Sequence, residues 1–163
     1  IAAIRDKKNV AMMSKHGVLS KIEMEARAEI QYEIYVKTIN IEGLTMVEMA
    51  RRHILPAVIS FKAALAEAIG SILAAGGNAD VEKELLGRVS DLTVSFSANL
   101  TALEAALEKA SRLHGNVKKQ AEAYRDLVFK AMGKLRGDAD RLEALVDADC
   151  WPMPTYSKLL FNI

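Results

Sequence analysis

The sequence predicts an all-α fold, arranged as a long-helix bundle with an antiparallel helical hairpin and a docked C-terminal tail. Apolar residues return at intervals of three and four along almost the whole chain, as on one face of an α-helix. Strand-like alternation is absent, and only three prolines and nine glycines interrupt the 163 residues. With 51% hydrophobic and 26% charged residues, the composition is that of a folded domain with its own core.

Residues 1–19 are expected to form the first helical piece. A helix over residues 1–15 should end near Gly17, because glycine readily adopts the left-handed conformation that follows a helix. Ser20 then opens a capping-box motif with Glu23, in which the serine oxygen accepts an early backbone N–H and the glutamate reaches back. A second helix should therefore begin at Ser20.

This second helix is predicted to be long. Its apolar positions at helical spacing are Ile22, Ile30, Ile34, Ile41, Met49, Ile54, Val58, Leu65, Ile69 and Ile72. It could be interrupted at Gly43, where a second capping-box match runs from Thr45 to Glu48, or at Pro56, which lacks an N–H. Because the apolar pattern resumes directly after Pro56, we expect a kink there rather than an end. The sequence Gly76-Gly77-Asn78 should terminate the helix.

Two more helices are expected to form the hairpin. The first, capped by Asp80, has the apolar positions Val81, Leu85, Val89, Leu92, Phe96, Leu100, Leu103, Leu107 and Leu113. The second has Val117, Ala121, Tyr124, Val128, Ala131, Leu135, Leu142 and Val146. Each helix has about 30 residues and would be ~45 Å long, because an α-helix rises 1.5 Å per residue. The short turn His114-Gly115-Asn116 between them requires an antiparallel pair. Residues 20–149 are thus expected to comprise a long kinked helix followed by this hairpin.

The tail, residues 150–163, is rich in tryptophan, proline and other apolar residues. Two prolines should hold it extended, and so much apolar surface at a terminus favours docking into a groove over a free end. The residues expected to dock are Trp151, Pro152, Tyr156, Leu160 and Phe161.

The sequence contains no motif that predicts a catalytic, cofactor-binding or metal-binding residue. None of His16, His53 and His114 has a glutamate three positions before it, so the Glu-x-x-His metal motif is absent. These histidines are expected on the surface or in turns. The single cysteine, Cys150, is expected to be a small buried hydrophobe rather than a nucleophile, and one thiol is compatible with a reducing compartment.

Charge and hydropathy give no sign of a nucleic-acid or membrane partner. The formal net charge is +1, without a basic or acidic block. The longest uncharged windows, Ala68–Ala79 and Leu92–Leu103, are shorter than the roughly 18 apolar residues of a membrane span. We expect no signal peptide and a cytoplasmic location, and the initial Ile1 suggests an upstream part.

Two blocks of sequence are similar to a known family. The run Lys15-His16-Gly17-Val18-Leu19-Ser20, with Glu23 and Arg27, resembles the turn and helix near the end of glutamine synthetase catalytic domains. Residues 35–46, 49–51 and 54–57 resemble the type III branch, as do Trp151-Pro152-Met153-Pro154-Thr155-Tyr156 and Leu159-Leu160-Phe161. The match is dense over residues 14–57 and 150–161, whereas residues 58–149 agree only in helicity and length. Departures stand at Gly43, Ala28 and Met153, where alanine, an aromatic residue and phenylalanine are expected.

The resemblance implies a role without catalysis for this chain. The parent enzyme would be an ATP-dependent glutamate–ammonia ligase using Mg or Mn, with its catalytic residues upstream of Ile1. Residues 1–19 would be the last helical piece of the catalytic domain, and the rest a C-terminal extension that serves packing and assembly. Its partners would be its own catalytic domain and neighbouring subunits of a ring homo-oligomer. Two alternatives are a regulatory module that binds an effector or protein, and a stand-alone helical adaptor.

Overall fold

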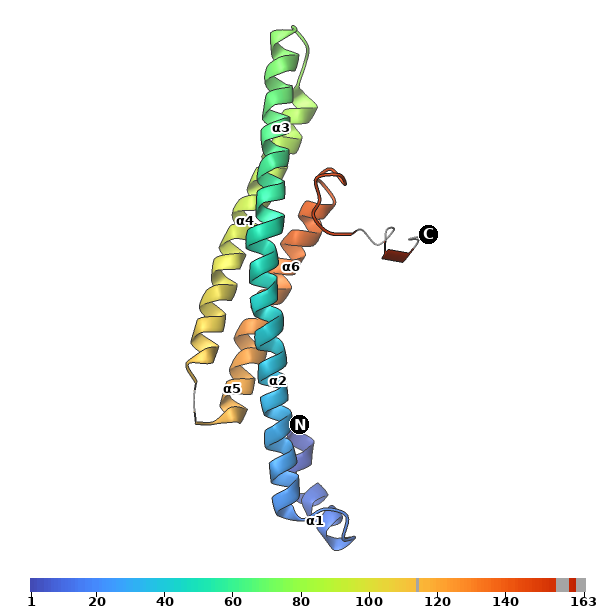
Figure 1. Cartoon of the computed structure of the whole chain (residues 1–163), viewed down its shortest axis with the longest axis vertical. Coiled ribbons are helices and arrows are strands. Elements are labelled where there is room, and N and C mark those ends of the chain that lie inside the picture. Colours follow the sequence, from blue (N-terminus) through green and yellow to red (C-terminus); the bar gives the residue numbers. More distant parts are fainter. Residues whose placement is uncertain (114, 155–158, 161–163) are drawn as a thin grey trace. The chain divides into compact units, whose positions relative to one another are not determined.

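The computed structural model describes residues 1–113, 115–154 and 159–160 (Figure 1). Every regular element in these residues is helical, which confirms the predicted all-α class. The α-helices are α1 (Lys7–Lys15), α2 (Lys21–Met49), α3 (Leu55–Ala74), α4 (Asp80–Ser111), α5 (Val117–Ala123) and α6 (Lys130–Glu143). A 3₁₀-helix, η1 (Ala2–Arg5), precedes them, and two π-helical segments, η2 (Ala50–Ile54) and η3 (Tyr124–Phe129), lie between α-helices.

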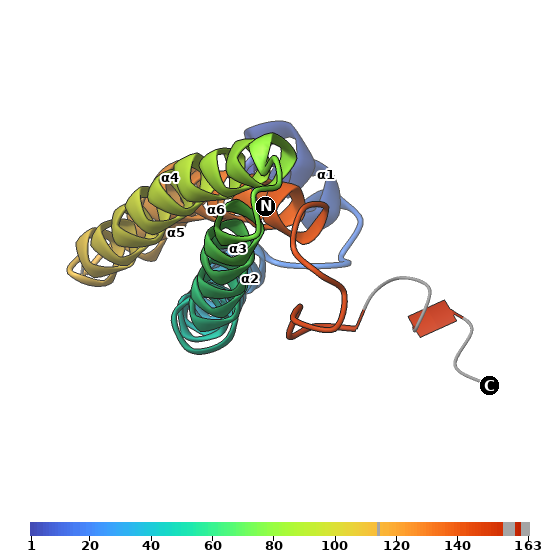
Figure 2. The same ribbon diagram turned by 90° about the horizontal axis from the view of Figure 1, so that it is seen from above.

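The chain divides into two compact units. The first unit comprises Ile1–Leu44 and Ala105–Lys130, and the second comprises Thr45–Glu104 and Ala131–Ile163. Each unit therefore combines two segments that are distant in sequence. In the second unit α6 lies beside α4, an arrangement that Figure 2 shows end-on and that direct hydrogen bonds between the two helices support.

The expected single helix over residues 1–15 is wrong, because the chain breaks at Asp6. This residue has extended backbone angles (φ −62°, ψ 132°) and caps α1 through a hydrogen bond of 2.9 Å from the Lys8 N–H. An aspartate that satisfies a free N–H starts a new helix rather than continuing the old one. The predicted end near Gly17 is confirmed, since Gly17 has φ +65° just after α1.

The capping box at the start of α2 is confirmed. The Ser20 backbone N–H donates to Glu23 Oε2 at 2.7 Å, and the Glu23 N–H donates to Ser20 Oγ at 3.3 Å. The backbone and hydroxyl hydrogen bonds from Ser20 hold the pKa of the Glu23 carboxyl below its ordinary value of 4.5. This reciprocal pairing uses N–H groups that the first turn of a helix cannot satisfy by itself.

The possible interruption at Gly43 does not occur, and α2 continues through Thr45 to Met49. Gly43 is buried inside the first unit, where a β-carbon would lie 2.9 Å from Leu107 Cδ2 and 3.4 Å from Val128 Cγ1. The glycine therefore serves close helix packing rather than a turn.

The helix passes through Pro56 as expected, with a π-helical turn directly before it. The Leu55 N–H donates to the Ala50 carbonyl, five residues back, and α3 begins with Pro56 in its first turn. Proline lacks an N–H and crowds the preceding turn, so a widened turn at this point accommodates it. The chain thus remains helical from Lys21 to Ala74.

The helix ends at the predicted Gly76-Gly77-Asn78 turn, but the next helix, α4, is not capped by the predicted residue. Gly76 has φ +78° after the end of α3. The Asp80 N–H donates to Asn78 Oδ1 at 2.9 Å, so Asn78 rather than Asp80 provides the capping oxygen. Asp80 is already the first residue of α4 and places its carboxylate at the helix N-terminus.

The second arm of the hairpin differs from the single α-helix that the sequence predicts. Asn116 caps it by accepting from the Lys119 N–H at 3.0 Å, but η3 separates α5 from α6. Within the first unit, buried Tyr124 opens η3 and donates its hydroxyl to Asn40 Oδ1 at 2.9 Å. Burial also raises the pKa of Tyr124. His114, in the predicted turn, lies outside the described residues.

Gly43→Val should lower the free energy of unfolding by about 1–3 kcal/mol more than Gly70→Val, because added bulk must displace Leu107. Gly70 is the matched control, since it lies inside α3 with no atom within 4 Å of an added β-carbon. Urea denaturation of the two variants measures the difference. Equal unfolding free energies would show that Gly43 is not tightly packed.

Ser20→Ala should raise the pKa of Glu23 towards 4.5. Because the folded-state pKa is depressed, the stabilisation from Glu23 is complete above 4.5 and is lost as the pH falls through the folded pKa. The variant should therefore lose less helicity on acidification. An NMR titration of the side-chain carboxyl checks this, with Thr45→Ala, from the unused capping box, as the control. A Glu23 titration that Ser20→Ala leaves unchanged would contradict the assignment.

Candidate functional site

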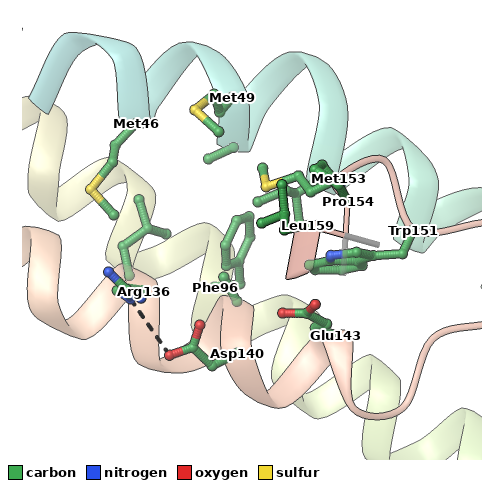
Figure 3. Close-up of a pocket in the computed structure, with 14 residues that line it drawn as sticks. Met46, Met49, Phe96, Arg136, Asp140, Glu143, Trp151, Met153, Pro154 and Leu159 are labelled. Carbon is green, nitrogen blue, oxygen red and sulfur yellow. Dashed lines mark ion pairs between the residues drawn. The ribbon is translucent and has the colours of Figure 1, made fainter. Parts of the chain in front are cut away.

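A pocket of about 340 Å³ opens in the second unit (Figure 3). It is formed by the end of α2, the π-helical turn η2, α4, α6 and the tail. Its apolar lining residues are Met46, Met49, Ala50, Ile54, Phe96, Leu135, Ala139, Trp151, Met153, Pro154 and Leu159. Such a concave, mostly apolar cavity with a few polar groups is typical of small-molecule sites.

The tail contributes Trp151 to this pocket, one of the residues that the sequence singled out for docking. Trp151 is only 7% exposed, whereas Pro152 is exposed and Leu160 is 71% exposed. Tyr156 and Phe161 lie outside the described residues. Docking of the tail as a whole therefore stays a prediction, with Trp151 as the buried member of the set.

Asp147 shapes the turn that directs Trp151 inward. Its carbonyl accepts the backbone N–H groups of Cys150 and Trp151 at 3.0 and 2.9 Å, and its Oδ1 accepts that of Asp149 at 2.8 Å. In this turn Cys150 faces solvent while Trp151 is buried. The expectation that Cys150 is a buried hydrophobe is therefore wrong, because a tight turn gives adjacent residues opposite environments.

Three charged residues of α6 lie on the rim of the pocket. Arg136 Nε lies 3.8 Å from Asp140 Oδ2, and Glu143 follows at the end of the helix. Figure 3 shows Arg136 turned towards Asp140, with Glu143 on the side nearer Trp151. The sequence did not single out these residues, although their spacings of three, four and seven place them on one helix face.

A buried carboxylate joins α4 and α6 within the second unit. Asp138 is 6% exposed, and its Oδ2 accepts hydrogen bonds from Ser95 Oγ at 2.6 Å and Asn99 Nδ2 at 2.8 Å. Arg141 Nη1 lies 3.5 Å from the other oxygen, Oδ1. A buried charge is tolerated only when such partners satisfy it, so these contacts fix how the two helices meet.

The described residues contain no group of three or more His, Cys, Asp or Glu side chains that could hold a metal ion. His16 and His53 are exposed, as the surface interpretation expects. The absence of catalytic, cofactor and metal residues in this chain stays a prediction.

Exposed apolar side chains form a second feature of the molecule. On α2, opposite the buried face of the first unit, the exposed fractions are 54% for Ile30, 51% for Ile34, 64% for Ile41 and 53% for Leu44. We call these four residues the outer row. In α3, Val58 is the one buried residue. The helix Lys21–Ala74 is long and apolar enough to cross a membrane by length and composition, with 6% of its most apolar window buried.

Comparisons with known proteins find similarity to glutamine synthetases. Residues 1–72 match the model of the glutamine synthetase C-terminal domain. The chain is 28% identical over 163 residues to a type-3 glutamine synthetase of Dictyostelium discoideum, with 97% of this chain covered. It is 30% identical over 159 residues to a glutamine synthetase of Butyrivibrio fibrisolvens and 25% identical over 163 residues to one of Bacteroides fragilis, with 95% and 96% of this chain covered.

These matches confirm the resemblance to the C-terminal region of a type III glutamine synthetase, with the family model matching residues 1–72. The similarity also extends through residues 58–149, for which the sequence motifs gave no support, because the aligned regions cover almost the whole chain. The chain spans 22% of the length of each of these relatives.

Asp138→Ala should lower the free energy of unfolding by about 2–4 kcal/mol, because the donors on Ser95 and Asn99 would lose their acceptor. The control is Asp91→Ala, an exposed aspartate on α4 whose loss should change stability by about 0.5 kcal/mol or less. Chemical denaturation measures both. Equal effects of the two substitutions would show that the Asp138 hydrogen bonds do not stabilise the fold.

Proposed function

We propose, from its place in the glutamine synthetase family, that this chain is the non-catalytic C-terminal helical segment of an ATP-dependent glutamate–ammonia ligase. Its role is to pack against the catalytic domain of its own subunit and against neighbouring subunits of a ring homo-oligomer. ATP and Mg or Mn belong to the parent enzyme, whose catalytic residues lie outside this chain, and the parent is cytoplasmic. The outer row on α2 is the observation that carries the proposal.

Helix α2 has apolar side chains on two opposite faces. One face is buried in the first unit through residues such as Met24, Ala28 and Ile39. The outer row occupies the other face and is more than half exposed at each position. An ordinary amphipathic helix presents polar residues to solvent, so a second apolar face indicates a second packing surface.

The size of this surface favours packing within an assembly over a free dimer. Complete burial of one large aliphatic side chain yields about 1.5–3 kcal/mol, so four half-exposed ones yield roughly 3–6 kcal/mol. Association of free molecules costs about 4–15 kcal/mol in lost translational and rotational freedom. A segment covalently joined to its catalytic domain avoids most of that cost, and the outer row is then sufficient.

The apolar surface of α3 fits protein contact better than lipid contact. Its 20 residues include Lys62 and Glu67, which divide the helix near its middle. A lysine near the centre of a membrane helix costs about 2.5–3.5 kcal/mol, and Pro56 would break the hydrogen-bond ladder at one end. Contact with neighbouring protein accommodates these residues because they can reach polar groups or water.

The tail is proposed to add a docking contact through Trp151, Pro152, Tyr156, Leu160 and Phe161. Burial of Trp151 against the apolar pocket of the second unit supports this role. The exposed side chains of Pro152 and Leu160 would then meet a neighbouring part of the enzyme.

A regulatory role is the second candidate, because the same pocket has the size of a small-molecule site. In that case the helices would bind an effector and bias the catalytic domain. A stand-alone adaptor has weaker support, since each matched relative is several times longer than this chain.

Replacing Ile34 and Ile41 together with glutamate in the full-length enzyme should reduce ring assembly, because the carboxylates would be desolvated at the packing surface. The control carries Gln31→Glu and Thr38→Glu, which add the same charge to exposed positions of α2 and keep the outer row. Analytical ultracentrifugation measures the fraction assembled.

Only the first pair should dissociate the ring or lower its thermal stability. If both pairs assemble and melt like the wild type, the outer row is not a packing surface. Circular dichroism of each variant establishes that α2 itself remains helical.

A further inference from the structure

We infer that the pocket of the second unit binds a small organic cation, an apolar or aromatic group that bears a single ammonium. This site shares no residue with the outer row, whereas Trp151 belongs both to the pocket and to the proposed docking contact of the tail. Three observations support it: the size and lining of the cavity, a carboxylate on its rim that has no ion-pair partner among the described residues, and an indole beside that carboxylate (Figure 3).

The cavity suits a compact ligand. Its volume of about 340 Å³ lies at the lower end of the ~300–1,000 Å³ range of small-molecule sites. A partner helix, ~10–12 Å across with its side chains, would not fit into such a space. The walls are mostly apolar, so the ligand needs an apolar body that displaces water from them.

The charge on the rim selects a cation. Among the lining residues, Arg136, Asp140 and Glu143 are charged, and Arg136 pairs with Asp140 at 3.8 Å. Glu143 makes no ion pair with any residue that the structure describes, and it is half-buried. Among the described residues, Glu143 is therefore left without a cationic partner at the edge of an apolar cavity, where an ammonium would neutralise it. An anionic ligand would meet two carboxylates against one guanidinium that is already paired.

The side chains around Glu143 also favour a cation with an aromatic or aliphatic body. Trp151 and Phe96 are buried and line the cavity, and the electron-rich faces of aromatic rings attract cations. Met46, Met49 and Met153 add polarizable thioethers that adapt to flat or irregular groups. The lining thus offers apolar contact along its length and negative potential at one end.

The natural reporter for this site is Trp151, the single tryptophan of the chain. Its fluorescence is recorded while the full chain is titrated with phenethylammonium, phenethyl alcohol or hydrocinnamate. These probes share a phenyl body and differ in charge. We expect saturable binding of the ammonium, with the neutral and anionic probes about tenfold weaker or more, because only the ammonium gains a charge-assisted contact.

Glu143→Gln tests the assigned partner. This substitution should weaken phenethylammonium binding about fivefold or more and leave phenethyl alcohol unaffected. Glu67→Gln, an exposed glutamate on α3 outside the pocket, is the matched control and should bind like the wild type. Thermal melts of both variants confirm that they fold.

Equal affinity for the ammonium and the alcohol would overturn the inference, as would unchanged ammonium binding in Glu143→Gln. The absence of saturable binding in both fluorescence and calorimetry would also overturn it. Ring assembly is not measured in this experiment, so its outcome is separate from that of the outer-row variants.

Discussion

The buried carboxylate of Asp138 is the constraint on which the second unit depends. A charge taken out of water is expensive, and it is compensated only where Ser95 and Asn99 on α4 present donors at hydrogen-bond distance. Sliding α6 along α4 would separate these groups, so one register is favoured over the others. In that register Leu135 and Leu142 are buried, while Arg136, Asp140 and Glu143 reach the pocket rim. The polar contact thus positions both the core and the candidate site.

Features that depend on neighbours in sequence could be predicted. The Ser20–Glu23 capping box and the glycines at positions 17 and 76 act within one helical turn, so the residue type alone indicates the structure. The π-helical segments could not be predicted in this way. The second segment begins at Tyr124, whose hydroxyl donates a hydrogen bond to Asn40, 84 residues earlier in the sequence. A contact between residues so far apart leaves no signal in the local sequence pattern.

The candidate site was predictable only in part. Trp151 stands out in the sequence because a large aromatic residue in a proline-rich terminus is unusual. Arg136, Asp140 and Glu143 do not, because charged residues at such spacing are ordinary on a solvated helix face. They become candidate site residues because the fold brings Met46 and Phe96, from distant segments, to line the same cavity. The sequence likewise does not distinguish Asp138 from the other carboxylates, because its burial depends on the packing of α6 against α4.

The turn at Asp147 has a practical consequence. It leaves the single cysteine of the chain in solvent and buries the single tryptophan beside it. A thiol-reactive dye on Cys150 would therefore be attached one residue from the indole without disturbing the core. A dye at this position would report on the solvent side of the turn, and the emission of Trp151 would report on its buried side. The chain thus carries two natural reporter positions at adjacent residues, one exposed to solvent and one buried.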